Sequence, residues 1–412
     1  MIHKALLIWG VAHALYLAAA ARVLLSRRRH ETGPIRSRWI VALVLAIGLI
    51  PRLLLLAAAP TLSEDLYRYL WDGRLVAHGV NPYPHAPSHP ALTRFRDGLY
   101  QHLNHATVPT IYPPAAQLLF AAAALLGGTP LAWKMILLAL EAALVLALLS
   151  LLARREMPPE RLLLYYWNPL IVVECYGSGH LDLALAAFLV VALALEASRK
   201  QAAAGLAFGA AVLTKLLPVL LIPTLVRRRA WTLLALAAAL TVGLYLPFIS
   251  AGESLWEGLR IYARHWDFNG PLYSLIRPAF PTGDAPRLIL AAALVVASCV
   301  IAWRARSWSG AAMAVWIAFL ALSPTVYPWY LVPAVALLPL DANPGLLVFS
   351  GTVALTYLPL SGFRATGVWS LPPWILWVEY GLALGAWAVV SLAGRRERRR
   401  VDLRRGTQSG RG

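Results

Sequence analysis

The residues best suited to chemistry follow the apolar segment 39–59, where Ser63, Glu64 and Asp65 open a run rich in aromatic residues. A carboxylate at the membrane boundary loses part of its hydration, which raises its pKa toward the range of a general base. Asp65, with Glu64 beside it, is therefore our candidate for deprotonating a hydroxyl group. The same residues also fit a helix start, with Ser63 as N-cap and both acids in the first turn.

A second carboxylate follows at helical spacing. Asp72 lies seven residues after Asp65, so both side chains project from nearly the same face of a helix predicted over 64–77. Arg68 lies near one carboxylate and Arg74 near the other. Asp72 and Arg74 are thus candidates either for substrate binding or for ion pairs on the protein surface.

Ionisable residues also interrupt the middle of the chain. His180 and Asp182 follow Glu174 across a glycine-flanked turn, at the ends of two apolar segments. Such groups at membrane depth are costly and usually functional, although Asp182 also fits an ion pair or an N-cap that joins two helices. Lys215 stands between two short apolar segments, where it either binds a phosphate or extends to the lipid headgroups.

Aromatic and basic residues near other helix ends could contact a sugar, a phosphate or the lipid interface. These candidates are Tyr83, Arg264, His265, Tyr327, Trp329 and Tyr330. No metal site is predicted, because the histidines between residues 78 and 105 match no standard ligand spacing. Cys175 and Cys299 lie far apart, so they indicate neither a disulfide nor a metal ligand.

Membrane helices must position these residues, because 59% of the chain is hydrophobic and only 14% is charged, against about 25% charged in soluble domains. We predict an all-α polytopic membrane protein of about 12–14 hydrophobic helices. The predicted segments are 5–25, 39–59, 131–152, 161–176, 181–197, 201–214, 216–226, 231–248, 287–303, 309–323, 328–341, 345–359 and 374–394.

Basic clusters between these segments predict the cytoplasmic connections. They lie at 27–29 with 36 and 38, and at 154–155, 199–200, 227–229, 304 with 306, and 395–400. If segment 113–128 crossed the membrane, every later cluster would fall outside, so we expect a re-entrant or interfacial helix there. Segments 201–214 and 216–226 are expected to form a broken helix pair around Lys215. A net charge of +18 distributed in this way indicates membrane topology rather than nucleic-acid binding.

The candidate residues then gather on the non-cytoplasmic side, where loop 60–112 holds the candidate catalytic acid. We expect residues 1–394 to form one integral membrane domain and 395–412 a basic cytoplasmic tail. The first apolar segment has more basic residues after it than before it, opposite to a signal peptide, so we expect it to be retained. The abundance of arginine over lysine favours a bacterial plasma (inner) membrane, with the site facing the periplasm or exterior.

The order of these motifs resembles the GT-C superfamily of glycosyltransferases that use polyprenyl-phosphate sugars. It is similar to bacterial polyprenyl-phosphomannose-dependent mannosyltransferases and to the catalytic subunit of GPI mannosyltransferase I. The matching elements are 65–72, 79–83, Tyr112-Pro113-Pro114, Asn168-Pro169-Leu170, Gly179-His180-Leu181-Asp182 and Lys215-Leu216-Leu217-Pro218. The resemblance covers residues 40 to about 230 and is weaker beyond them.

The resemblance implies an inverting transfer of a hexose, with mannose favoured, from a polyprenyl-phosphate donor to a lipid or glycan acceptor. Asp65 would take the acceptor proton, and Lys215 would stabilise the departing phosphate. One departure is Ser63, which replaces the first aspartate of the Asp-x-Asp signature in the eukaryotic relative. This departure leaves two alternatives, no metal at all or a divalent metal for which Glu64 replaces the missing aspartate in part. No other cofactor is indicated.

A transporter or flippase of lipid-linked sugars is the main alternative, because such proteins also contain broken helices and intramembrane charge. It predicts two related halves, whereas the sequence shows no internal repeat and its polar residues gather at one face. A polymerase or ligase of surface glycans would also use a lipid-linked donor. The expected partners are a polyprenyl-phosphate sugar, a lipid or glycan acceptor and membrane lipids, with no nucleic acid.

Overall fold

The computed structural model describes residues 2–25, 34–280 and 282–409. Within these ranges the regular elements are helices, and the only β-type pairings are isolated bridges from Phe268 and Asn269 to Thr325. Seven helices among the described residues are long and apolar enough to cross a membrane, and five shorter apolar helices accompany them. The predicted all-α, multi-pass membrane class is confirmed.

The elements follow one another along the chain as α-helices with short 3₁₀ or π segments between them. They are α1 (Ile2–Leu25), α2 (Pro34–Leu56), α3 (Asp65–Ala77), η1 (Pro90–Phe95), η2 (Tyr100–His102), α4 (Pro114–Leu125), α5 (Pro130–Arg154), η3 (Pro159–Leu162), α6 (Leu163–Tyr166), α7 (Pro169–Ile171), η4 (Val172–Gly177), α8 (Asp182–Ala197), α9 (Gln201–Thr214), η5 (Leu217–Leu221), α10 (Ile222–Arg227), α11 (Trp231–Tyr245), η6 (Leu246–Trp256), α12 (Glu257–His265), α13 (Pro271–Ile276), η7 (Arg277–Ala279), α14 (Ala285–Arg304), α15 (Trp308–Leu322), η8 (Pro328–Leu331), α16 (Val332–Leu337), α17 (Pro344–Thr352), η9 (Val353–Tyr357), α18 (Leu360–Thr366) and α19 (Pro373–Ser409).

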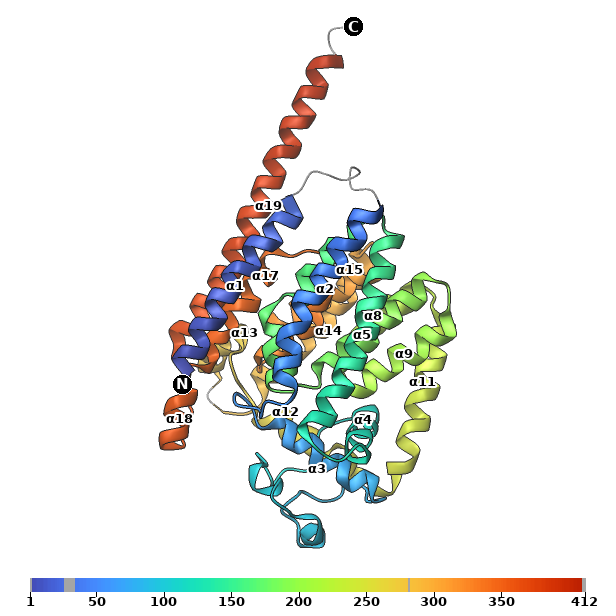
Figure 1. The fold of residues 1–412 in the computed structure, drawn as a ribbon, viewed down its shortest axis with the longest axis vertical. Helices are drawn as coiled ribbons and strands as arrows, with labels where there is room; N and C mark the ends of the chain where they lie inside the picture. Colours follow the sequence, from blue (N-terminus) through green and yellow to red (C-terminus); the bar gives the residue numbers. More distant parts are fainter. Residues whose placement is uncertain (1, 26–33, 281, 410–412) are drawn as a thin grey trace.

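Helix α3 lies across one end of the bundle, below the long helices α1, α2 and α5 in Figure 1. It packs closely on α4, where the rings of Tyr69 and Phe120 stack with centroids 4.7 Å apart. Gly73 makes this approach possible, since a Cβ atom there would lie 2.1 Å from the carbonyl oxygen of Phe120. Because α3 is held against α4, its first residue is fixed relative to the bundle.

Helix α4 enters and leaves at the same end of the bundle. The chain turns back after it at Gly127 and Gly128, both with positive φ, and Thr129 caps α5 through its hydroxyl. Near its start, α5 then contacts the loop after α2, where Lys134 Nζ donates to the carbonyl of Ala58 at 2.7 Å. The re-entrant or interfacial placement of this helix in the membrane stays a prediction.

Three predicted segments are less regular than expected. Segment 161–176 is not one helix but is divided into α6, α7 and the π-type turn η4, because Pro169 holds Asn168 in an extended conformation. Segments 328–341 and 345–359 likewise begin or end in 3₁₀ turns. The predicted break at Lys215 is present, since this residue has extended backbone angles between α9 and η5.

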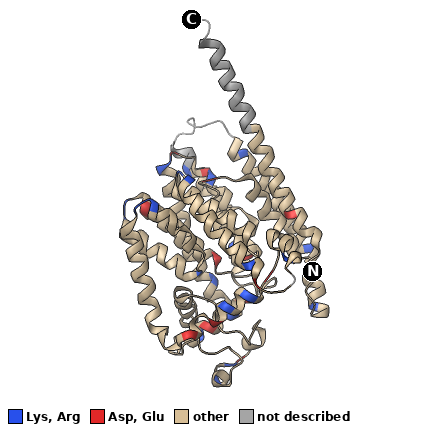
Figure 2. Ribbon diagram, turned by 180° about the vertical axis from the view of Figure 1, so that it is seen from behind, with Lys and Arg blue, Asp and Glu red and all other residues tan. Residues whose placement is uncertain are grey.

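Several basic connections contact one another. Arg155 lies 3.7 Å from Asp341, Arg227 donates to the carbonyls of Ala302 and Ala305, and Arg228 pairs with Glu196 at 2.7 Å. Figure 2 shows that charged residues are sparse along the helices between such connections. The cluster at 27–29 lies outside the described residues, and the predicted tail continues α19 as far as Ser409.

Candidate active site

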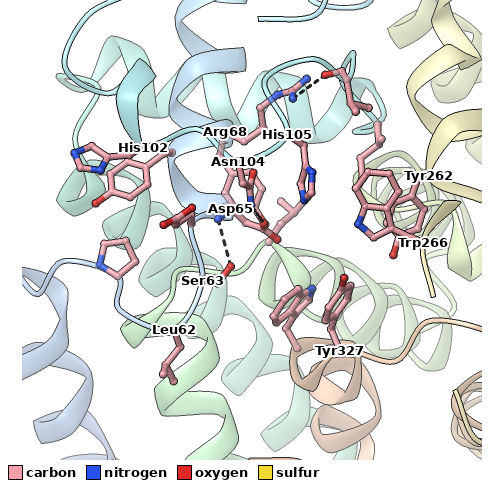
Figure 3. Close-up of a pocket in the computed structure, with 18 of the residues that line it drawn as sticks. Leu62, Ser63, Asp65, Arg68, His102, Asn104, His105, Tyr262, Trp266 and Tyr327 are labelled. Carbon is pink, nitrogen blue, oxygen red and sulfur yellow. Dashed lines mark hydrogen bonds between the residues drawn. The ribbon is translucent and has the colours of Figure 1, made fainter. Parts of the chain in front are cut away.

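A polar cavity of about 740 Å³ lies beside the start of α3. Figure 3 shows Asp65 near the middle of its lining, with His102 on one side and Tyr262 and Trp266 on the other. Among the residues predicted for the site, those that line this cavity are Glu64, Asp65, Asp182, Lys215, Tyr327, Trp329 and Tyr330. Predicted residues from four distant parts of the chain thus converge on one cavity.

Asp65 is the first residue of α3 and points into this cavity. Its backbone N–H donates to the hydroxyl of Ser63 at 3.3 Å. The predicted helix start was wrong by one residue, because Glu64 and not Ser63 occupies the N-cap position, without a side-chain capping hydrogen bond. Asn104 donates to Oδ1 of Asp65 at 2.9 Å. Burial raises the pKa of the Asp65 carboxyl, while the hydrogen bond from Asn104 and the charge of Lys215 oppose that rise. A carboxylate in this setting can act as a general base.

Lys215 supplies a cation to the same cavity. Its Nζ lies 2.8 Å from Oδ1 of Asp182 and 3.8 Å from the centre of the Tyr330 ring. The side chain is 27% exposed, whereas that of Asp182 is only 4% exposed. The ammonium is therefore held at the cavity wall rather than extended toward lipid headgroups, and one of its faces remains accessible to a ligand.

A second, largely apolar cavity of about 850 Å³ adjoins the first. Residues of η5, α12, α14 and α15, many of them leucine or aromatic, form most of its lining. The two cavities share Ile111, Tyr112, Asp182, Lys215, Tyr262, Trp266 and Tyr330. The cation of Lys215 therefore stands where a polar space meets an apolar one.

Aromatic rings form one wall of the polar cavity. Trp329 stacks on Tyr327 with ring centroids 4.5 Å apart, and Tyr327 stacks in turn on Phe268 at 4.7 Å. His180 lies on Trp329 at 3.7 Å. Because these ring faces are used within the row, Tyr327 and Trp329 offer a sugar mainly their edges and polar atoms.

The predicted residues of the second half of α3 lie elsewhere. Asp72 is buried, and its carboxylate accepts hydrogen bonds from Arg68, Thr110 and Gln117 at 2.9, 2.5 and 3.2 Å. Asp72 does form an ion pair, with Arg68, but the pair is in the interior and not on the surface as one alternative predicted. The second carboxylate of α3 thus holds loop 60–112 in place and does not reach either cavity.

Four other predicted residues also lie away from the polar cavity. Arg74 pairs with Asp97 at 2.7 Å and not with Asp72. Tyr83 is buried and donates its hydroxyl to the carbonyl of Tyr112. His265 is exposed and lines neither cavity, whereas its neighbour Arg264 lines the apolar one.

Some cavity residues were not predicted from the sequence. Asn104, which donates to Asp65, belongs to the loop between the predicted motifs. Tyr262 belongs to α12, and its hydroxyl oxygen lies 2.5 Å from the hydroxyl oxygen of Tyr330. Glu174 lies beneath the cavity and was noted only as an ionisable residue. An amide or a tyrosine in a polar loop has no signal of its own, but a glutamate within an apolar segment does.

Within the described ranges, no group of three or more His, Cys, Asp or Glu side chains is arranged to hold a metal ion. One oxygen of Asp65 accepts a hydrogen bond from Asn104, and the other faces His180. With serine at position 63, the donor set does not fit a metal held by two aspartates of an Asp-x-Asp signature.

Comparison with known proteins gives one family and one solved structure of note. The family model "alpha-(1→6)-mannopyranosyltransferase, N-terminal domain" matches residues 2–231, which is more than half of the chain. The crystal structure of ArnT from Cupriavidus metallidurans, bound to undecaprenyl phosphate, matches with 19% identity and a TM-score of 0.44, over 86% of this chain and 72% of that one. No curated protein sequence matches.

Proposed function

Because the chain belongs to the alpha-(1→6)-mannopyranosyltransferase family, we propose that it transfers mannose from a polyprenyl-phosphate donor to a hydroxyl group of a lipid or glycan acceptor. The family makes the chain a glycosyltransferase. The donor, the acceptor class and the roles of individual residues are the additional content of the proposal. So is the placement of the reaction on the non-cytoplasmic side of the plasma membrane.

The meeting of the two cavities at Lys215 is the observation that supports this donor. A polyprenyl-phosphate sugar has a long apolar chain, one anionic phosphate and a polar sugar, in that order. The apolar cavity, the ammonium of Lys215 and the polar cavity offer complementary environments in the same order. A nucleotide sugar would leave the apolar cavity without a ligand group of matching chemistry.

Asp65 acts as the general base in this proposal. It takes the proton of the acceptor hydroxyl as the oxygen attacks the anomeric carbon of the sugar. The bond from that carbon to the phosphate oxygen breaks on the opposite face, so the configuration is inverted. The released phosphate carries the electron pair, and Lys215 stabilises its charge in a site partly closed to water.

No metal takes part in the proposed reaction. Lys215 supplies the positive charge that a divalent ion would supply to the leaving phosphate. Arg264 and Arg287, which line the apolar cavity, can attract the donor headgroup as it enters. Residues 1–394 act as one catalytic domain, with loop 60–112 closing the polar cavity.

The test uses purified protein in nanodiscs with radiolabelled polyprenyl-phosphomannose and a membrane lipid extract as acceptor. Transfer of label by the wild type, and its loss in Asp65→Asn with folding intact, is the expected result. Absence of transfer from this donor, with transfer from another lipid-linked sugar, would change the donor alone. Movement of label across sealed vesicles without transfer would replace the proposal with a flippase.

A further inference from the structure

A buried histidine lies directly behind the proposed base. His180 is completely buried and is flanked by two carboxylates. Its Nδ1 lies 3.8 Å from Oδ2 of Asp65, and its Nε2 lies 3.4 Å from Oε2 of Glu174. The imidazole therefore connects a carboxylate in the cavity with a carboxylate that no solvent reaches.

The polar atoms of this group lack ordinary partners. Within the described part of the chain, neither ring nitrogen of His180 has a hydrogen-bond partner. Glu174 is fully buried, and the hydroxyl of Tyr357 lies 3.0 Å from both of its oxygens. Buried polar atoms are normally satisfied, so an unpartnered imidazole between two carboxylates calls for a reason.

The two distances indicate which nitrogen carries the proton. A neutral imidazole has one N–H group and one lone pair. The shorter separation, to Glu174, suits the N–H donor, and the longer one suits a lone pair that faces the ionised carboxylate of Asp65. We therefore assign the N–H to Nε2, which leaves Nδ1 free to accept a proton.

We propose that Asp65, His180 and Glu174 form a proton relay, a role that rests on the proposed function of Asp65 as the base. The proton that Asp65 removes from the acceptor hydroxyl passes to Nδ1 of His180. The proton on Nε2 passes at the same time to Glu174. One proton enters the group, Asp65 is ionised again, and Glu174 holds the proton until it returns through His180 and Asp65 to the cavity solvent after product release.

The surroundings of the relay favour such a transfer. The stack with Trp329 fixes the imidazole plane, and Tyr357 orients the terminal carboxylate. The other charged groups that face it are Asp182 of α8 and Lys215, which pair with each other. The distances from the ring nitrogens of His180 to Asp65 and to Glu174, 3.8 and 3.4 Å, are longer than an ordinary hydrogen bond. Catalytic contacts of this kind commonly shorten when substrate binds.

The test compares Glu174→Gln with the wild type in the mannose-transfer assay. Glutamine keeps the shape and accepts hydrogen bonds, but it cannot store a proton. We expect kcat to fall by about 10- to 100-fold with little change in KM, since a group one step from the base contributes less than the base itself. Only the ionised form of Glu174 can accept the proton, so the wild-type rate falls where Glu174 is protonated. Glutamine removes this dependence, and the acid limb of the pH–rate profile moves to lower pH.

Glu379→Gln is the matched control, because Glu379 is also fully buried and has a single hydrogen-bond donor, Asn269, at 2.7 Å. It should leave both kcat and the pH profile unchanged. If Glu174→Gln does not fold, Tyr357→Phe keeps the carboxylate and removes only its hydroxyl partner, and a smaller shift of the profile is expected. An unchanged kcat and profile in the folded variant would overturn the relay. Absence of transfer by the wild type would instead count against the proposed function.

Discussion

Two buried ionic groups in this protein have opposite characters. One joins Arg52 of α2 to Glu141 of α5, and the other joins Asp65, His180 and Glu174 around the polar cavity. Both lie in or next to apolar helices, where charge is costly. Only the second contacts a cavity and leaves polar atoms without partners.

The group at Arg52 is fully satisfied. Two nitrogens of the guanidinium bind the two oxygens of Glu141 at 2.7 and 2.8 Å, and the third donates to the carbonyls of Gly48 and Tyr166. The hydroxyls of Tyr165 and Tyr176 also donate to Glu141, at 2.7 and 2.5 Å. Its charges are neutralised and its donors used, so it joins helices and has no capacity left for a ligand.

The comparison teaches that burial of charge does not by itself identify a functional site. Asp65 and Asp72 show the same difference within one helix. The carboxylate of Asp72 accepts hydrogen bonds from three side chains, whereas that of Asp65 faces a cavity and accepts one, from Asn104. A free lone pair next to accessible space separates the candidate base from the structural acids.

The largest expected effect is the loss of activity in Asp65→Asn. General base catalysis contributes about 10²- to 10⁴-fold, and asparagine cannot accept the proton. Burial raises the pKa of Asp65, so its ionised form costs folding stability at neutral pH that is regained as pH falls through the raised value. Asparagine removes that cost, and the thermal midpoint in detergent should be unchanged or higher. A clear fall in that midpoint would place Asp65 with the structural acids.

Glu141→Gln should have the opposite effect. It leaves the guanidinium of Arg52 buried without its counter-charge, and breaking a buried pair in this way costs about 3–5 kcal/mol. Thermal unfolding followed by size-exclusion chromatography measures the loss. The double variant Arg52→Met with Glu141→Leu should recover much of the stability, because neither charge is then left alone. If the double variant unfolds as readily as the single one, the pair is more than a structural contact.

Lys215→Met should weaken use of the donor without loss of fold. Removing one cation from the leaving phosphate should reduce kcat/KM by about 10- to 100-fold, since a single stabilising group of this kind contributes a few kcal/mol. Lys215→Arg is the control, because it keeps the charge. Equal kcat/KM in wild type and Lys215→Met would show that the ammonium serves only to balance Asp182.

Asp72→Asn should lower stability by about 1–3 kcal/mol, the cost of leaving a buried charged partner poorly paired. Transfer activity per folded molecule should change little, because Asp72 reaches neither cavity. The thermal midpoint and the transfer rate per folded molecule should be measured on one preparation, which shows whether Asp72 is structural or catalytic. A large loss of kcat with unchanged stability would move Asp72 from the structural group to the catalytic one.

The smallest expected effect is that of a chelator. EDTA should not change the transfer rate, because Lys215 supplies the charge at the phosphate in the proposed reaction. Ser63→Asp restores the Asp-x-Asp pair, so its transfer rate with added Mg²⁺ or Mn²⁺ should be compared with that of the wild type. Inactivation of the wild type by EDTA, with recovery on adding metal, would refute a metal-free site.

The sequence by itself determined the membrane class and much of the candidate site. Apolar segments separated by arginine runs are sufficient to predict the helices, because the bilayer imposes their length and composition. Asp65, Asp182 and Lys215 stand out because each is a charge at the end of an apolar segment. Arg52 and Glu141 carried the same signal inside segments 39–59 and 131–152, but their pairing could not be read from it.

Tertiary structure alone decided which charges are satisfied and which remain available. Glu174 meets Tyr357 across 183 residues of chain, Asp65 meets Asn104 across 39, and Arg52 meets Glu141 across 89. No local pattern encodes such contacts, because they depend on which faces of distant helices pack together. The position of Lys215 between a polar and an apolar cavity also depends on packing. Both cavities are lined by helices that are far apart in the sequence and that only the packed bundle brings together.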